Sequence, residues 1–362
     1  MKIAVNAIPY TRWSGIETFL RNLLLFWPDN TQDEIVIFTN QRAAKFLQPL
    51  PANLKIKIKT FSRLSRWRLF LYQQIALPAV LRREKFDLLF CASLLAPWSY
   101  RRKIITIHDA APFILKKETG PIGKIFWNIN LLFNRRSALK IITVSEFSKQ
   151  ELIKKLGIKE NNLEIIFNGA PLIGADESRP EAKREKYFVT VGNARPRKNL
   201  EILFRALTDP HNKLTDFKLL VIGQLDSRMK KLQKKYNSSQ IIFTGFVAEK
   251  EKYALIKKAS ALIFPSLHEG FGLPIVEAGK LRTPVVCSDI PAFREIAGDS
   301  ALFFNPQDEK ELVQKIKETI ESAQTIFTLG EKGYANARRF NWPESAAKLA
   351  SIIHHYENPA NK

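Results

Sequence analysis

The chain has 362 residues, of which 45% are hydrophobic and 25% charged, and its 57 lysines and arginines against 35 acidic residues give a net charge of +22. This length exceeds what one hydrophobic core usually serves, and the ordinary composition excludes a chain built from disordered or biased tracts. The positive surplus favours an anionic partner, whether nucleic acid, an anionic membrane or a phosphorylated ligand, without choosing among them.

The cysteines and the lengths of the apolar runs indicate in which cellular compartment the protein is expected. Cys91 and Cys287 both lie in apolar runs typical of buried strands, which favours free thiols in a reducing compartment over a disulfide or a metal site. The first apolar run is too short for a signal peptide, and no apolar stretch approaches the ~20 residues of a membrane-spanning helix. We expect a cytoplasmic protein that could also bind peripherally to the inner face of the cytoplasmic membrane.

Short apolar runs alternate with amphipathic stretches along nearly the whole chain, as expected for parallel sheets joined by crossover helices. The strands expected in the first half span residues 2–5, 34–38, 55–58, 87–90, 103–107, 140–144 and 163–167. Those expected in the second half span residues 187–191, 217–222, 240–243, 261–264, 284–287 and 301–304. The polar segment 174–186 should link two α/β domains, and Pro343 should open a terminal helix.

Ligands of open parallel sheets bind beyond the carboxyl ends of the strands, and four such ends carry unusual residues. In the first, Ser14 and Glu17 have capping-box spacing and Gly15 would let backbone approach a ligand, although an ordinary capped helix explains the stretch equally well. In the second, His108 follows a buried strand and could project into a cleft, although a histidine there is more often structural.

The third strand end, within 191–204, concentrates cations at the start of a predicted helix. Asn199 should cap this helix, and Arg195, Arg197 and Lys198 come just before it. A helix amino terminus already carries about half a positive charge, so these cations are unfavourably placed unless an anion lies between them. Phosphate is a common ligand of such a terminus, and a solvated basic loop is the alternative.

The fourth strand end, within 267–280, carries two carboxylates. Glu269 lies in a glycine-bearing loop after a short apolar run, and Leu273-Pro274 predicts that the helix containing Glu277 begins there. Carboxylates beside a helix amino terminus can accept hydrogen bonds from sugar hydroxyls, while the terminus and the cations of the basic loop hold phosphates. These groups together fit a nucleotide-diphosphate sugar.

The same motifs resemble those of retaining glycosyltransferases of family 4, which have the GT-B fold. The matching segments are HEGFGLPIVEA, VGNARPRKNL, TIHDAAPF, ITVSEFSKQEL, IIFNGA, TGFV and TPVVCSDIPAFREIAGDSALFFNPQD. The resemblance covers essentially the whole chain and implies an α/β fold with two doubly wound Rossmann-like domains facing a central cleft. An acceptor-binding domain over 1–173 would precede a nucleotide-sugar-binding domain over 187–340, and a helix over 341–362 would pack back on the first domain.

The resemblance also implies roles for individual residues. Lys198 and Arg197 would neutralise the departing diphosphate, Glu269 would contact the donor sugar, and His108 would border the reacting sugar. Glu277 would hold the ribose hydroxyls. The other expected donor-binding positions are Gly15, Asn193, Gly245, Phe246, Val247, Phe271, Gly272 and Leu273, with the nucleobase near 245–247. Many family members carry arginine where this chain has Asn193, and Arg197 is expected to substitute for it.

The implied activity is sugar transfer with retention of configuration, without a cofactor or an essential metal, and the chain contains no Asp-x-Asp motif. The expected partners are a nucleotide sugar, GDP-mannose being favoured over UDP- and dTDP-sugars, and a glycan or polyprenyl-linked acceptor in cell-surface polysaccharide synthesis. A GT-B phosphorylase or a nucleotide-sugar epimerase is the alternative. A nucleic-acid-binding protein would also account for the charge, but no recognition motif supports it.

Two amphipathic stretches remain. Segment 61–85 mixes aromatic residues with Arg63, Arg66, Trp67 and Arg68, which could contact an anionic membrane or the acceptor, or could pack its apolar face into the core. Segment 123–140 carries apolar residues at helical spacing, and we expect it to lie in the core. Its apolar residues are Ile125, Phe126, Ile129, Leu132 and Phe133.

Overall fold

The computed structural model describes residues 1–9, 15–47, 50, 55–61, 66–115, 118–173 and 184–357. The chain divides into two compact units, which are described separately. Unit 1 comprises Met1–Asn168 and Asn341–Lys362, and unit 2 comprises Gly169–Phe340. Most of the predicted linker, residues 174–183, lies outside the described residues, as does Ser14 of the expected capping box.

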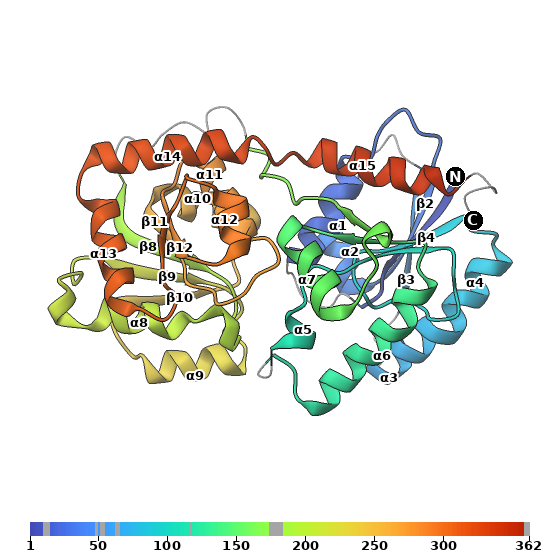
Figure 1. The fold of residues 1–362 in the computed structure, drawn as a ribbon, viewed down its shortest axis with the longest axis horizontal. Coiled ribbons are helices and arrows are strands. Elements are labelled where there is room, and N and C mark those ends of the chain that lie inside the picture. Colours follow the sequence, from blue (N-terminus) through green and yellow to red (C-terminus); the bar gives the residue numbers. More distant parts are fainter. Residues whose placement is uncertain are drawn as a thin grey trace. The chain divides into compact units, whose positions relative to one another are not determined.

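Unit 1 is built on a parallel sheet with the strand order β3-β2-β1-β4-β5-β6-β7 (Figure 1). Its strands are β1 (Lys2–Ala7), β2 (Glu34–Asn40), β3 (Lys55–Phe61), β4 (Leu88–Cys91), β5 (Lys103–Thr106), β6 (Lys140–Thr143) and β7 (Leu163–Ile165). Its helices are α1 (Gly15–Leu25), α2 (Gln41–Leu47), α3 (Arg66–Leu71), α4 (Leu77–Arg83), α5 (Ala111–Ile114), α6 (Pro121–Ser137), α7 (Glu146–Leu156) and α15 (Trp342–His355). A π-helical turn, Tyr72–Ala76, joins α3 to α4.

Unit 2 repeats this plan on a parallel sheet with the order β10-β9-β8-β11-β12-β13 (Figure 1). Its strands are β8 (Glu185–Val191), β9 (Lys218–Ile222), β10 (Ile241–Gly245), β11 (Ala259–Phe264), β12 (Val285–Ser288) and β13 (Leu302–Phe304). Its helices are α8 (Leu200–Thr208), α9 (Ser227–Lys235), α10 (Glu249–Lys258), α11 (Leu273–Lys280), α12 (Pro291–Ala297), α13 (Glu309–Ile320) and α14 (Ala323–Ala337). Every strand expected from the sequence is present, with ends shifted by a few residues at most.

The central strands are apolar along their length because helices cover both faces of each sheet. All four residues of β4 are buried, as are all six of β11. In each sheet the first strand of the unit lies inside, with β2 and β4 flanking β1 and β9 and β11 flanking β8. The direction of winding therefore reverses beside β1 and beside β8, and such a reversal is where open sheets bind ligands.

The last helix, α15, belongs to unit 1, as the resemblance implied. Pro343 lies in its first turn, where a missing N–H costs nothing. The Trp342 ring lies 6.3 Å from the Phe19 ring of α1, and Nε2 of His354 lies 2.9 Å from Oδ2 of the buried Asp33. Apolar packing at one end and a charge-assisted hydrogen bond at the other hold α15 against the sheet layer of unit 1.

The expectation for segment 123–140 is wrong. The segment forms α6, but its five predicted core residues are exposed, and the buried face instead contains Asn130, Leu131 and Asn134. Helical spacing shows that residues share a face, but it does not show which face a neighbouring element covers. The helix is held to unit 1 through this mixed polar and apolar face and through ring contacts of Phe126 and Phe133.

Segment 61–85 forms α3, the π-helical turn and α4, and part of its apolar face does pack inward. Leu77 and Leu81 are buried in the unit 1 core, whereas Leu71 and Ile75 are exposed. Arg68 is exposed. Arg63 lies outside the described residues, as do the side chains of Arg66 and Trp67, so the suggested role of these residues stays a prediction.

Candidate active site

In unit 2, two loops leave the sheet at the edge where its winding reverses. Strands β8 and β11 are parallel neighbours, so the loop after β8, residues 192–199, and the loop after β11, residues 265–272, emerge side by side. The Leu267 N–H donates to the Arg197 carbonyl at 2.7 Å. This backbone hydrogen bond fastens the basic loop to the loop that carries the first glutamate.

The carboxylate of Glu269 lies between the two cations of the basic loop. Its Oε1 is 2.5 Å from Nζ of Lys198, and its Oε2 is 3.0 Å from Nη1 of Arg197. The Ser266 hydroxyl donates to Oε1 at 2.8 Å, and the Lys198 ammonium lies 5.0 Å from the centre of the Phe264 ring. A buried carboxylate thus has charged or hydrogen-bonding partners on both oxygens.

The charges in this cluster are strongly coupled. Burial opposes the ionisation of Glu269, but the nearby Lys198 and Arg197 charges, together with the Ser266 hydroxyl, outweigh it and lower the pKa of Glu269 to about 2. The glutamate is therefore ionised at neutral pH. Arg197 also donates to the carbonyl of His268 at 2.9 Å, so its guanidinium spans the backbone and the carboxylate of the same loop.

The expected cap of the following helix is only partly correct. Asn199 occupies the cap position of α8, but its φ is 52° and its side chain makes no capping hydrogen bond. Its amide instead donates to the Pro306 carbonyl at 2.9 Å. Pro196–Lys198 form a single 3₁₀ turn before α8, and Lys198 is directed to Glu269. The anion that the sequence required beside these cations is thus supplied by the chain itself.

The second glutamate has a different environment. Glu277 is buried in α11, and its Oε1 lies 2.7 Å from Nζ of Lys252 in α10. Burial raises the pKa of Glu277, and the Lys252 charge only partly offsets that effect. Helix α11 lies very close to α14, since a Cβ on Gly279 would come within 2.6 Å of the Gly333 carbonyl oxygen. This close packing fixes the helix that carries Glu277.

The turn between the two glutamates requires glycine. Gly272 has a φ of 107°, and a Cβ there would lie 3.0 Å from the Phe293 ring. Phe271 is buried with its ring against Phe340, and Leu273, the first residue of α11, is half-buried. The backbone between Glu269 and α11 therefore has little freedom to move.

Three glycines come together at the ends of adjacent strands. A Cβ on Gly223, after β9, would lie 1.8 Å from the Gly192 carbonyl oxygen, after β8. The Gly223 N–H donates to the carbonyl of Gly245, at the end of β10, at 3.2 Å. Beyond Gly245, Phe246 is exposed and Val247 is half-buried. The backbone floor beside the basic loop therefore has no room for a side chain at Gly223, and Gly245 has a positive φ of 74° that favours glycine.

Asn193, the remaining predicted donor-binding residue of the basic loop, shapes the loop itself. The Asn193 side-chain oxygen accepts from the Arg195 N–H at 3.2 Å, which closes a turn, and Arg195 itself is exposed. Among the described residues, no hydrogen bond joins Asn193 to Glu269. The expectation that Arg197 acts in place of an arginine at 193 stays a prediction, and it agrees with the direct contact between Arg197 and Glu269.

Two predicted residues belong to unit 1, at the carboxyl edge of its sheet. His108 follows β5, and its Nε2 lies 2.9 Å from the Ala92 carbonyl, which requires Nε2 to carry the proton. Burial lowers the pKa of His108, and the ring meets that of Phe19 from α1 at 5.1 Å. Gly15 begins α1, and apart from its chain neighbours and its own helix, no atom of the described residues lies within 4 Å of the position a Cβ would take.

The structure thus gathers Arg197, Lys198 and Glu269 into one cluster and places Glu277 in a separate ion pair. Sequence reasoning missed Ser266 and Lys252, the additional partners of the two glutamates. Ser266 lies next to the motif and could have been suspected from that position. Lys252 carries no local signal, because α10 comes to α11 only through the fold.

Among the described residues, no group of three histidine, cysteine, aspartate or glutamate side chains is arranged to hold a metal ion. The expectation of a reaction without an essential metal is not tested by this and stays a prediction. None of the described helices has the length and apolarity needed to cross a membrane.

Two family models match the chain. The model of glycosyl transferases group 1 matches residues 175–359, and the model of Glycosyltransferase Family 4 matches residues 13–172. The first therefore covers the half that holds the charged cluster, and the second covers the half that holds Gly15 and His108.

Individual proteins agree with these matches. The O-antigen chain mannosyltransferase RfbU of Salmonella typhimurium is 30% identical over 223 residues, which span 60% of this chain and 60% of that protein. The O-antigen chain mannosyltransferase B of Escherichia coli is 27% identical over 262 residues, 68% of each. The crystal structure of Anabaena HepE, in complex with UDP and glucose, covers 98% of this chain and 99% of its own with a TM-score of 0.76 at 19% identity. The fold is GT-B.

Proposed function

The chain belongs to the glycosyl transferases of group 1, and we propose that it moves a sugar from a nucleotide-diphosphate donor to a glycan or lipid-linked acceptor. In this proposal the sugar is of the mannose type, its anomeric configuration is retained, and no metal ion is essential. The setting is cell-surface polysaccharide synthesis on the cytoplasmic side of the membrane. The O-antigen mannosyltransferases among its relatives support the sugar and the setting.

The observation that carries the proposal is the position of Glu269 between Lys198 and Arg197. Two cations fixed in the loop after β8 form a site for a dianion, and the glutamate from the loop after β11 occupies them when no diphosphate is bound. A diphosphate that gains charge as its bond to the sugar breaks would be stabilised by these cations, which is usually the largest catalytic contribution in such a site.

The same arrangement would couple donor binding to sugar recognition. When the diphosphate takes the two cations, the carboxylate of Glu269 becomes available to accept hydrogen bonds from the donor sugar. Glu277 would hold the ribose hydroxyls in the same way after releasing Lys252. The glycine floor at 192, 223 and 245 would let the nucleotide lie against backbone, with the base near Phe246. His108, neutral and donating to Ala92, would border the reacting sugar.

A melting-temperature panel tests the donor site. The full chain in chelator is heated with GDP, UDP, ADP, dTDP and the corresponding sugars, alongside Lys198→Ala and the exposed control Lys234→Ala. A ligand at one hundred times its Kd should stabilise the fold by about 2.7 kcal/mol. We expect a shift with one base, GDP being favoured, that Lys198→Ala weakens and Lys234→Ala leaves unchanged. No shift with any nucleotide would rule out the diphosphate site.

Product analysis tests the reaction. With the donor identified, proton NMR of the transferred sugar reports its anomeric configuration, and an inverted product would contradict the proposal. Donor incubated without acceptor provides the control. Rapid appearance of an isomerised donor, or of a sugar phosphate when inorganic phosphate is added, would indicate an epimerase or a phosphorylase on the same fold.

A further inference from the structure

Helix α6 of unit 1 leaves a large apolar face uncovered. The exposed fractions of its side chains are 85% for Ile122, 59% for Ile125, 37% for Phe126, 38% for Ile129, 41% for Leu132 and 47% for Phe133. These residues recur at spacings of three and four, so they lie on one face of the helix. A contiguous apolar row of this kind on a soluble surface usually marks an interaction site.

The opposite face of the helix carries its buried contacts with unit 1. Leu131 packs into the unit 1 core, and the Asn134 amide donates to the Leu94 carbonyl at 3.0 Å. The Trp98 indole N–H donates to the Asn130 side-chain oxygen at 3.2 Å. The other side of α6 therefore anchors it. Within the row, Phe126 and Phe133 also touch rings of unit 1, whereas Ile122 and Ile125 are the most exposed.

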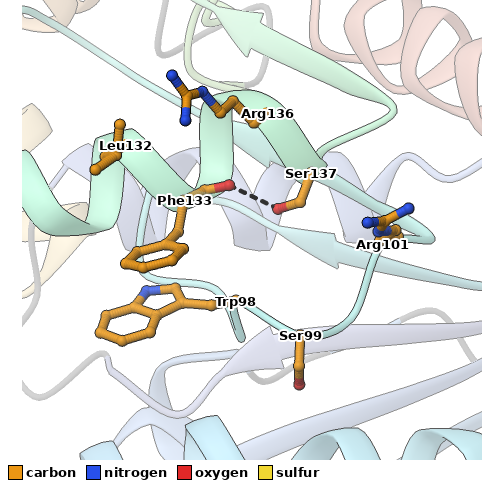
Figure 2. Close-up of a pocket in the computed structure, with 7 residues that line it drawn as sticks. All are labelled: Trp98, Ser99, Arg101, Leu132, Phe133, Arg136 and Ser137. Atoms are coloured by element: carbon orange, nitrogen blue, oxygen red, sulfur yellow. Dashed lines mark hydrogen bonds between the residues drawn. The ribbon is translucent and has the colours of Figure 1, made fainter.

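A cavity of about 540 Å³ opens at the carboxyl-terminal end of this row (Figure 2). The Trp98 ring stacks on the Phe133 ring at 4.7 Å, and Arg101 and Arg136 also line the cavity. Both arginines are exposed, and neither forms an ion pair with any residue that the structure describes. Two unneutralised guanidinium groups thus lie next to an aromatic stack and an aliphatic row.

We propose that the α6 surface, meaning the exposed row of α6 together with Arg101 and Arg136, docks unit 1 on an anionic lipid bilayer. The aliphatic and aromatic side chains would enter the acyl region, and the guanidinium groups would contact lipid phosphates. Lys124 adds an exposed cation on the same helix, and the net charge of +22 favours approach to an anionic surface. This inference does not depend on the proposed transferase activity.

Charge complementarity distinguishes this occupant from a second copy of the chain. In a two-fold interface the same patch faces itself, and since α6 contributes no carboxylate, Arg101, Arg136 and Lys124 would meet only apolar side chains or other cations of the partner's α6 surface. An anionic bilayer instead supplies phosphates at the depth of the cations and hydrocarbon at the depth of the isoleucines. Segment 61–85, the membrane-contact candidate in the sequence, is a separate element that contacts α6 through Phe70 and Phe126, whose rings lie 6.1 Å apart.

Vesicle co-sedimentation of the full chain tests the proposal. The lipids are phosphatidylcholine alone and phosphatidylcholine mixed with phosphatidylglycerol. The double variant Ile122→Asn with Ile125→Asn removes the most exposed part of the row, and Phe327→Asn, at a side chain 53% exposed on α14, is the matched apolar control. We expect binding to the anionic vesicles only, weakened about tenfold or more by the double variant and unchanged by the control.

Two further double variants distinguish the charges of the α6 surface from the net charge of the whole protein. Arg101→Glu with Arg136→Glu and Lys231→Glu with Lys234→Glu change the net charge equally, but the second pair lies on exposed positions of α9 in unit 2. We expect the arginine pair to weaken vesicle binding strongly and the lysine pair to have little effect. Equal loss with both pairs would show that only the overall charge attracts the lipid, which overturns the docking surface.

A labelled cysteine locates the contact. Cys91 and Cys287 are fully buried, so an environment-sensitive dye can be attached at Ile125→Cys, with Phe327→Cys as the control. A blue shift at position 125 on anionic vesicles, absent at 327, is expected. Unchanged dye emission at 125, or unchanged binding of the double asparagine variant, contradicts the proposal. Sedimentation velocity provides the remaining test, since conversion of a dimer to a monomer by Ile122→Asn with Ile125→Asn would assign the face to a second copy.

Discussion

Nζ of Lys198 lies 2.5 Å from Oε1 of Glu269, although 71 residues separate them in the chain. The ion pair forms because β8 and β11 are parallel neighbours whose following loops share one edge of the sheet. The lysine that is proposed to hold the donor diphosphate is therefore already paired with the carboxylate that is proposed to hold the donor sugar. Any diphosphate that binds here has to compete with Glu269.

That competition leads to a prediction for Glu269→Gln. The neutral side chain keeps the shape but releases the two cations, so affinity for a nucleoside diphosphate without its sugar should stay the same or increase. Sugar transfer should fall roughly 10²-fold or more, as expected when a group positioned at the reacting sugar loses its charge. Calorimetric titration of the diphosphate and initial rates with the full donor measure the two effects.

The matched control for Glu269→Gln is Glu201→Gln. Glu201 pairs with Lys235 on the exposed surface of the same unit, so the charge change is the same while the site is untouched. This variant should leave both affinity and rate near the original values. If Glu269→Gln weakened diphosphate binding, the glutamate would not be a competitor for the cations.

The same carboxylate predicts a pH dependence of stability. Its folded pKa of about 2 lies below its usual value of 4.5, so its ionisation stabilises the fold fully above pH 4.5. This contribution, on the order of 3 kcal/mol, is lost as the pH falls from 4.5 towards 2. Urea unfolding of the original chain and of Glu269→Gln should differ most above pH 5 and converge near pH 2. A difference independent of pH would refute the assignment.

The Lys252–Glu277 pair predicts an asymmetric double-mutant cycle. Burial raises the pKa of Glu277, so its ionised form is tolerated largely because Lys252 is 2.7 Å away. Lys252→Met leaves a buried, unpaired carboxylate and should destabilise the fold by about 3 kcal/mol at pH 7. This loss should shrink as the pH falls towards the raised pKa, because protonation then removes the buried charge.

Adding Glu277→Gln to Lys252→Met should restore most of the lost stability at pH 7, while the double variant should still bind nucleotide weakly if the glutamate holds the ribose. Chemical unfolding gives the stabilities, and the nucleotide melting panel gives the binding. Failure of the second substitution to rescue the first would show that Lys252 acts through its packing rather than through Glu277.

Two glycine-to-alanine variants should have opposite consequences. Gly223→Ala would place a methyl group 1.8 Å from the Gly192 carbonyl oxygen, so the ends of β8 and β9 must separate and unit 2 should lose several kcal/mol of stability. Gly15→Ala meets no side chain that the structure describes at the start of α1 and should keep or slightly raise the melting temperature. If Gly15 faces the donor, its variant should nevertheless lose transfer activity.

Thermal unfolding and initial rates separate these two outcomes. A Gly15→Ala variant that is both stable and fully active would remove Gly15 from the donor site. A Gly223→Ala variant that folds normally would contradict the close approach of the two strand ends.

Much of this molecule follows from its sequence. The apolar runs located each strand to within a few residues, because strands buried on both faces must be continuously apolar and short. Alternation with amphipathic stretches then implied parallel sheets with crossover helices, which places loop residues such as Lys198, Glu269 and His108 at the carboxyl edges. The excess of cations before α8 also signalled an anion, although it did not show that the anion was Glu269.

Only the tertiary structure determined which charged residues form ion pairs and which helix faces are covered by neighbouring elements. Glu269 pairs with Lys198 and Glu277 with Lys252 because of the order of strands and helices in space, and hydrophobic periodicity carries no information on that order. The periodicity of α6 has the same limit, since it showed one apolar side but not that neighbouring elements cover the other. Local patterns act over a few residues and determined the elements, whereas contacts between distant segments determined what those elements can bind.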